Sequence, residues 1–143
     1  MKKLFSLLVA ASCMAGLTTP VQAEQTPDGL IAVSHFEKLE GCLIAMTDVL
    51  ASVKNKESAD ATAPKLIEAA NKLKEQMNAM IALQHTLKQE PNEDDNKAFE
   101  EWNTRLHVAG IALQQELARL AMVEFYGSEE FIAALMSLQS FGQ

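Results

Sequence analysis

Histidine side chains are candidates for metal binding and proton transfer in this sequence, because imidazole is a common metal ligand and proton carrier. The chain has three of them, His35, His85 and His107. Two ligands on one helix face need a spacing of about four residues, and no two of these histidines are that close. His85 and His107 each follow a core position by one residue, so we expect them to face solvent. The histidines therefore predict no metal site.

Sulfur-bearing side chains form a second set of candidates. Met46, Met77, Met80 and Cys42 are the residues that could supply soft ligands to Cu(I), and an inward methionine could also ligate haem. The three methionines, however, occupy apolar positions where methionine is ordinary packing material. Cys42 is interpreted as a small buried apolar residue, with an intermolecular contact as the alternative. Packing is the favoured interpretation, and we expect no metal or other cofactor.

Carboxylates occur in adjacent pairs at Asp94–Asp95, Glu100–Glu101 and Glu129–Glu130. Neighbouring side chains on a helix point about 100° apart, so the members of a pair do not converge on one substrate. We expect the stretch from Asp94 to Glu101 to be a solvated acidic face, with no acid turned inward. The sequence also lacks Cys-x-x-Cys motifs, nucleophilic triads and glycine-rich phosphate loops. These observations predict no catalytic residues and a protein that is not an enzyme.

Composition indicates which elements carry these side chains. The 143 residues are 48% hydrophobic, 22% charged and 6% aromatic. This length suits one domain, and the scarcity of β-branched and aromatic residues favours helices over strands. The formal net charge of −7 offers no basic surface for nucleic acid. We expect a single all-α domain that does not bind nucleic acid.

The N-terminal segment has the pattern of an export signal. Two lysines precede an uncharged apolar run that ends at Leu17, and a small-x-small motif ends at Ala23. The pattern predicts a signal peptide over residues 1–23, cleavage between Ala23 and Glu24, and a helical domain over 24–143. The mature chain is then periplasmic or extracellular and has no membrane span, because the apolar run is shorter than the ~20 residues that a spanning helix needs.

Two other interpretations of this segment stay open. It could remain uncleaved as an anchor, or Cys13 could be lipidated and tether the protein to a membrane. Cleavage would remove two lysines and no acid, which takes the net charge from −7 to −9. It would also remove Cys13 and leave Cys42 as the lone cysteine, with no internal disulfide.

Apolar residues recur at alternating steps of three and four, which predicts long helices over 27–55, 63–89 and 93–126. A short fourth helix follows Ser128. Short connections predict an antiparallel up-down-up bundle of the three long helices, in which the second and third form a hairpin and the fourth caps one end. The predicted core positions are Ala32, Phe36, Leu39, Leu43, Met46, Leu50 and Val53; Leu66, Ala70, Leu73, Met77, Met80, Gln84 and Leu87; and Phe99, Trp102, Leu106, Ala109, Leu113, Leu117 and Leu120. We expect Phe36, Phe99 and Trp102 to cluster near Pro91.

Capping residues predict where the helices begin. Thr26, Asn92 and Ser128 are the predicted N-caps of the first, third and fourth helices, and Gly127 ends the third in a left-handed conformation. The second helix has two competing starts: Thr62 as cap with Pro64 in the first turn, or Ser58 as cap with Pro64 producing a kink.

Three short stretches lie around the start of the second predicted helix: Asp48–Leu50, Val53–Ala59 with its Ser-Ala pair, and Ala63–Leu66 with Pro-Lys-Leu. In combination they resemble a group of small exported helical proteins of planctomycete and verrucomicrobial bacteria. The terminal stretch Gly127–Leu135 is similar to the last helix of that group. The resemblance implies the helical topology and the export, and it implies no activity because the group is uncharacterised.

We predict an exported, non-enzymatic bundle that acts by contact with an unknown protein or with a second copy. Val33, Ile44, Ile81 and Ile111 lie beside the core positions, which favours an apolar stripe left uncovered for self-association. Two alternatives stay open. One is a small-ligand or soft-metal (Cu or haem) carrier in the envelope, and the other is a chaperone-like envelope binder, which would need a concave apolar face.

Overall fold

The computed structural model describes residues 24–139, and this part of the chain is helical without strands, as the composition predicts. The predicted signal peptide, with Cys13 and Ala23, lies outside the described residues. The elements are α2 (Pro27–Ala51), α3 (Lys56–Thr86), α4 (Glu93–Met122), the short 3-10 turn η1 (Glu124–Gly127) and α5 (Glu129–Gln139). Among the described helices, none is long and apolar enough to cross a membrane.

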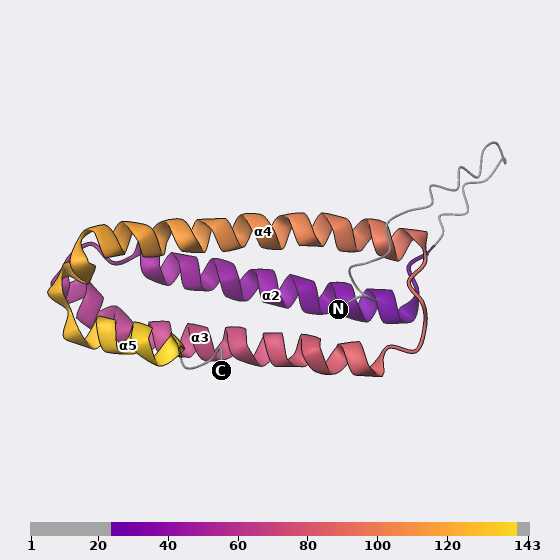
Figure 1. Ribbon diagram of the computed structural model, residues 1–143, viewed down its shortest axis with the longest axis horizontal. Helices are drawn as coiled ribbons and strands as arrows, with labels where there is room; N and C mark the ends of the chain where they lie inside the picture. The colour runs from indigo at the N-terminus through magenta and orange to yellow at the C-terminus, as the bar shows by residue number, and fades with distance from the viewer. Residues whose placement is uncertain (1–23, 140–143) are drawn as a thin grey trace.

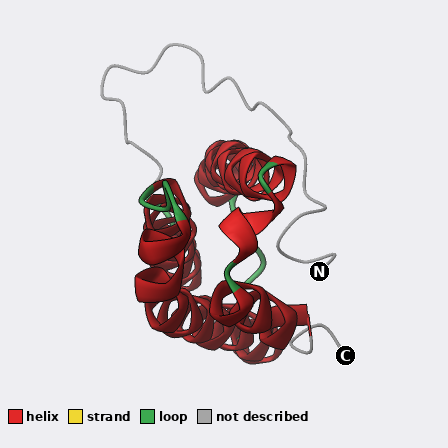
Figure 2. Cartoon of the chain, turned by 90° about the vertical axis from the view of Figure 1, so that its left-hand side faces the viewer, coloured by secondary structure: helices red, strands yellow, loops and turns green. Residues whose placement is uncertain are grey.

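The three long helices lie alongside one another, and α2 runs between the other two (Figure 1). α2 packs along both α3 and α4, whereas the backbones of α3 and α4 come near each other at few points. The predicted hairpin of these two helices therefore exists in the chain path, with α2 lying between its two helices. Seen from one end, the helices form an open arc (Figure 2). Helical periodicity indicates which face of a helix is buried, but it does not indicate which helix covers that face.

The predicted caps of α2, α4 and α5 are confirmed. The Thr26 hydroxyl accepts a hydrogen bond from the Gly29 N–H (3.0 Å), and Pro27 fills the first helical position. The Asn92 side chain accepts from the Asp95 N–H (2.8 Å), and the Ser128 hydroxyl accepts from the Phe131 N–H (3.0 Å). These side chains satisfy backbone donors that have no partner inside the helix.

The start of α3 is neither of the two predicted ones. Asn55 is the N-cap, and its side chain accepts from the Ser58 N–H (2.8 Å) while the Ser58 hydroxyl accepts from the Asn55 N–H (3.0 Å). This reciprocal capping box starts the helix before Thr62, which is buried. Pro64 lies inside the helix at an exposed position, so it did not mark the first turn.

The long helices also end earlier than predicted. α2 ends at Ala51 and not at 55, because Asn55 caps the next helix. α3 ends at Thr86 and not at 89, and α4 ends at Met122 and not at 126, where the chain passes into η1. In each case the last predicted turn lies in the connection.

Two hydrophobic clusters form the core, one near each end of the molecule. The first includes Leu50, Leu66, Leu120 and Phe131, and it joins α2, α3, α4 and α5. The second lies near the α3–α4 connection and includes Phe36 and Phe99, whose rings meet edge to face at 5.6 Å, with Trp102 packed against it. The predicted aromatic cluster near Pro91 is thus confirmed.

Candidate functional site

The open side of the helix arc, between α3 and α4, carries a strip of apolar side chains that we call the groove. Its floor is α2, where Phe36 and Met46 belong to the two end clusters. Between them, Leu39 and Leu43 occupy the same helix face but are only half-buried. They stay partly open to solvent because α3 and α4, which lie on either side, do not close over α2.

In the uncovered half of the groove, the walls include apolar and small residues that are open to solvent. On α3, Met77 is 51% exposed and Ile81 is 52% exposed, although Met77 is a predicted core position. On α4, Gly110 shares a helix face with Leu106, Leu113 and Leu117. A Cβ added at Gly110 would meet nothing within 4 Å, so the space beside this glycine is empty of described residues.

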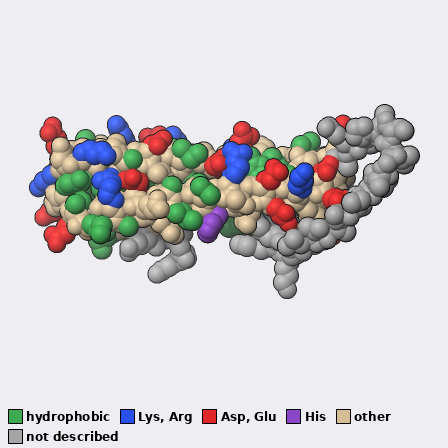
Figure 3. Space-filling model, turned by 90° about the horizontal axis from the view of Figure 1, so that it is seen from above, with side chains coloured by type: hydrophobic (Ala, Val, Ile, Leu, Met, Phe, Trp, Pro, Cys, Tyr) green, Lys and Arg blue, Asp and Glu red, His purple; other side chains and the backbone are tan. Residues whose placement is uncertain are grey.

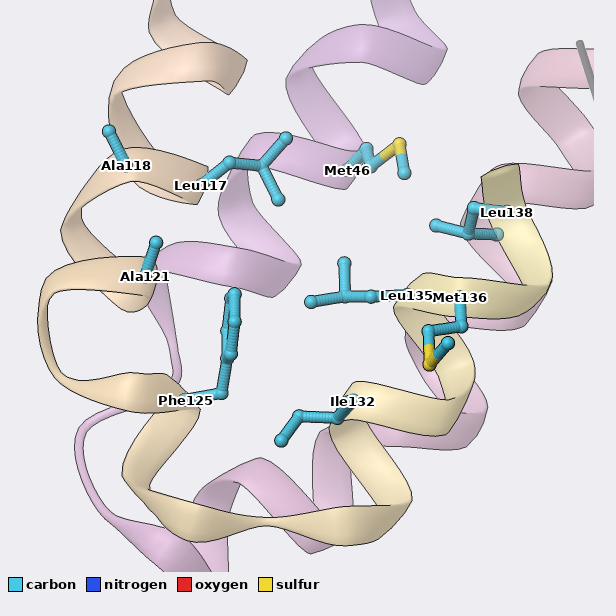
Figure 4. Close-up of a pocket in the computed structure, with 9 residues that line it drawn as sticks. All are labelled: Met46, Leu117, Ala118, Ala121, Phe125, Ile132, Leu135, Met136 and Leu138. Atoms are coloured by element: carbon cyan, nitrogen blue, oxygen red, sulfur yellow. The ribbon is translucent and has the colours of Figure 1, made fainter.

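The other half of the groove narrows to a pocket of about 600 Å³ between α4 and α5 (Figure 4). Its side chains come from α2, α4, η1 and α5, and all are apolar: Met46, Leu117, Ala118, Ala121, Phe125, Ile132, Leu135, Met136 and Leu138. Phe125, Ile132 and Leu135 point toward its centre. A pocket without a polar lining group can hold hydrocarbon, but it offers nothing to orient a reacting group.

The helix α5 forms one side of this pocket because it is anchored on α3. Phe131 is fully buried and Ala134 nearly so, both within the larger core cluster. The Ser128 hydroxyl donates a hydrogen bond to Asp60 Oδ1 (2.5 Å) at the start of α5. The Phe125 and Phe131 rings lie 6.1 Å apart and join the turn to the helix. The structure thus already seats one amphipathic helix beside α3.

The connection from α4 to α5 is a turn of left-handed backbone. Glu124, Phe125 and Tyr126 have φ of 48°, 53° and 54°, and Gly127 has φ of 67°. Glycine adopts this conformation freely, as predicted for Gly127, but a residue with a Cβ is strained there by about 1–2 kcal/mol. Sequence reasoning missed the three non-glycine residues, since nothing in their types indicates positive φ.

Charged side chains of both signs are spread over the face seen in Figure 3, with hydrophobic side chains between them. Arg105 of α4 makes a bidentate pair with Glu40 of α2 (2.6 and 3.0 Å) and covers the Trp102 ring at 4.0 Å. Ile44 and Ile111, two of the predicted uncovered apolar residues, are exposed, whereas Val33 packs against the Phe36 cluster.

The candidate soft-metal ligands do not gather at one place. Met46 belongs to the cluster around Leu50, and Met80 belongs to the cluster around Phe36. Met77 is half-exposed on the groove wall. Cys42 is free and half-buried in a separate small pocket with charged neighbours on α3, and burial raises the pKa of its thiol.

The histidines are equally dispersed. His85 and His107 are exposed, and His35 is half-buried. Within residues 24–139, no three side chains of His, Cys, Asp or Glu are placed to hold a metal ion.

One carboxylate is turned inward, which corrects the prediction that none would be. Asp95 is fully buried between the starts of α2 and α4. It accepts hydrogen bonds from the Thr26 N–H (3.0 Å), the Thr26 hydroxyl (2.7 Å) and the Asn92 N–H (3.0 Å). Asp95 is therefore a cap shared by two helices, and its oxygens are occupied by that role.

No family model, curated protein or solved structure matches the chain.

Proposed function

We propose that the protein is an exported, non-enzymatic binding protein that acts by protein contact, and that its groove receives an amphipathic helix of another chain. The observation that carries the proposal is the uncovered apolar half of the groove, bounded by α3, α2 and α4. The proposed export rests on the signal pattern of residues 1–23.

The shape of the groove favours a helix as the occupant. α5 is itself a helix with one apolar face, and it lies against α3 at the other end of the same groove. Beyond α5, the wall of α3 continues from Ala70 to Met80, which is about 15 Å or three helical turns. An incoming helix with residues at i, i+3, i+4 and i+7 would cover this length.

Gly110 supports the same occupant. A glycine inside a helix costs about 1 kcal/mol relative to alanine. The described chain brings no atom near the place of its missing Cβ, so the internal packing gives no reason for it. A partner helix that approaches the backbone of α4 closely at this point would give one.

A chaperone-like role is the second candidate, and the apolar lining of the pocket between α4 and α5 supports it. The two roles differ in selectivity. A helix receptor discriminates by the pattern of apolar residues, whereas a client binder accepts apolar segments in any order.

The test compares two fluorescent peptides of about 18 residues with identical composition. One places leucines on a single helical stripe, and the other scatters them. Titration with the full chain should show at least tenfold tighter binding of the striped peptide. Equal affinities would favour the chaperone-like role, and binding of neither peptide would refute both.

A further inference from the structure

We infer that α5 is an exchangeable arm: in a dimer of this chain, α5 of each copy occupies the seat on α3 of the other. The inference goes beyond the helix receptor proposed above. It concerns the half of the groove that α5 already fills, and it holds whether or not an outside helix binds the open half.

The closed arrangement of α5 has a conformational cost. To place α5 on its own α3, the chain reverses through four consecutive residues with positive φ, and Glu124, Phe125 and Tyr126 carry side chains. Left-handed backbone is normally confined to single residues, mostly glycine. Short hinges under strain favour exchange of the element that follows, since exchange lets the hinge relax.

Exchange preserves the contacts that hold α5 on α3. Its anchors are the buried Phe131 and Ala134 and the hydrogen bond from Ser128 to Asp60. All three join α5 to the core around α3, and the same seat exists on every copy. The exchanged dimer therefore keeps these contacts and loses the left-handed turn.

Exchange also affects the apolar pocket. Met46, Leu117 and Ala121 would come from one copy, and Ile132 and Leu135 would come from the α5 of the other. The partner copy would thus complete the site. The ends of two molecules would meet at η1, which lies at the end of the molecule away from the α3–α4 connection (Figure 1).

Cross-linking tests the exchange directly. In the full chain with Cys13→Ser and Cys42→Ser, one version carries Asp60→Cys and a second carries Ser128→Cys. The two are refolded together at high concentration and treated with a short bis-maleimide. Exchange predicts a covalent dimer in the mixture, joined between the cysteine at position 60 of one version and the cysteine at position 128 of the other. It predicts no covalent dimer when either version is treated alone. The version with both cysteines, kept dilute, is the control and should link within one chain. Efficient linking in the control without heterodimer in the mixture would refute the exchange.

Hinge variants give a second measurement that leaves the anchors intact. Glu124→Gly, at an exposed residue with positive φ, should relax the closed hinge and weaken dimerisation roughly tenfold or more in sedimentation velocity. Gly127→Ala should strain it and strengthen dimerisation by a similar factor, since a Cβ there meets nothing within 4 Å and acts through the backbone alone. A strict monomer for all versions, or shifts of the same sign in both variants, would overturn the inference.

Discussion

The carboxylate of Asp95 occupies the space that a side chain on Gly29 would need. This contact joins residues far apart in the sequence, and it brings the first turns of α2 and α4 together. Because Asp95 also accepts hydrogen bonds from Thr26 and Asn92, one buried side chain fixes the relative position of the two helix starts. That position determines how α2 and α4 lie at the end of the groove that is nearest to the α3–α4 connection.

Gly29→Ala should destabilise the fold by about 2–4 kcal/mol, because the added methyl group displaces a buried, hydrogen-bonded carboxylate. Urea denaturation followed by circular dichroism measures the free energy of unfolding. Gly41→Ala is the matched control. A Cβ at Gly41 meets nothing within 4 Å, so the same change there should be neutral or stabilise by up to about 1 kcal/mol. Equal effects of the two substitutions would contradict the described contact.

Asp95→Asn should cost about 2–3 kcal/mol. The groups that face the Asp95 carboxylate are all donors, namely the Thr26 N–H, the Thr26 hydroxyl and the Asn92 N–H. An amide would turn its NH2 toward at least one of them. Asp94→Asn, next to it, should change the free energy of unfolding by less than about 0.5 kcal/mol. If the two substitutions cost the same, Asp95 is not the shared cap.

Arg119→Lys should cost about 1–2 kcal/mol, because the Arg119 guanidinium donates to the carbonyls of Leu50 (3.0 Å) and Val53 (3.2 Å) at the end of α2. Arg105→Lys on the same helix should cost less than about 1 kcal/mol, since Arg105 is largely exposed. Thermal unfolding of both variants checks the order. A larger effect at Arg105 would show that the α2 terminus does not depend on Arg119.

Asp28 should titrate below its ordinary value. Its carboxylate accepts hydrogen bonds from the N–H groups of Gln89 (3.0 Å) and Lys88 (2.9 Å), and these lower its pKa from 3.8. A pKa that is lower in the folded state stabilises the fold above the unfolded value. That contribution is lost as the pH falls through the folded value. Carboxyl chemical shifts measured against pH report the midpoint, and one at or above 3.8 would contradict the two hydrogen bonds.

The sequence predicts the local structure well where one residue and its near neighbours decide it. The caps at Thr26, Asn92 and Ser128 follow from side-chain chemistry within a single turn. The start of α3 was missed because Pro64 resembles a first-turn proline. Asn55 begins the helix further upstream, and the proline is accommodated on the exposed face.

The groove could not be predicted in the same way. Periodicity identifies Leu39, Leu43 and Met77 as apolar-face residues, but their burial depends on how far apart α3 and α4 lie. The burial of Asp95 was missed for a related reason. At the third position of a helix an acid is explained by the helix dipole, and the contact with Gly29 comes from packing between distant segments. Nothing local marks either feature.

The presence of a helix in the groove is tested by measuring the affinity of the striped peptide for Gly110→Leu and for Gly41→Leu. Both glycines lie inside helices with open space beside them, and only Gly110 shares the helix face that borders the groove. A helix bound in the groove predicts at least tenfold weaker binding for Gly110→Leu and unchanged binding for Gly41→Leu. Unchanged binding for both variants would contradict a helix in the groove between α3 and α4.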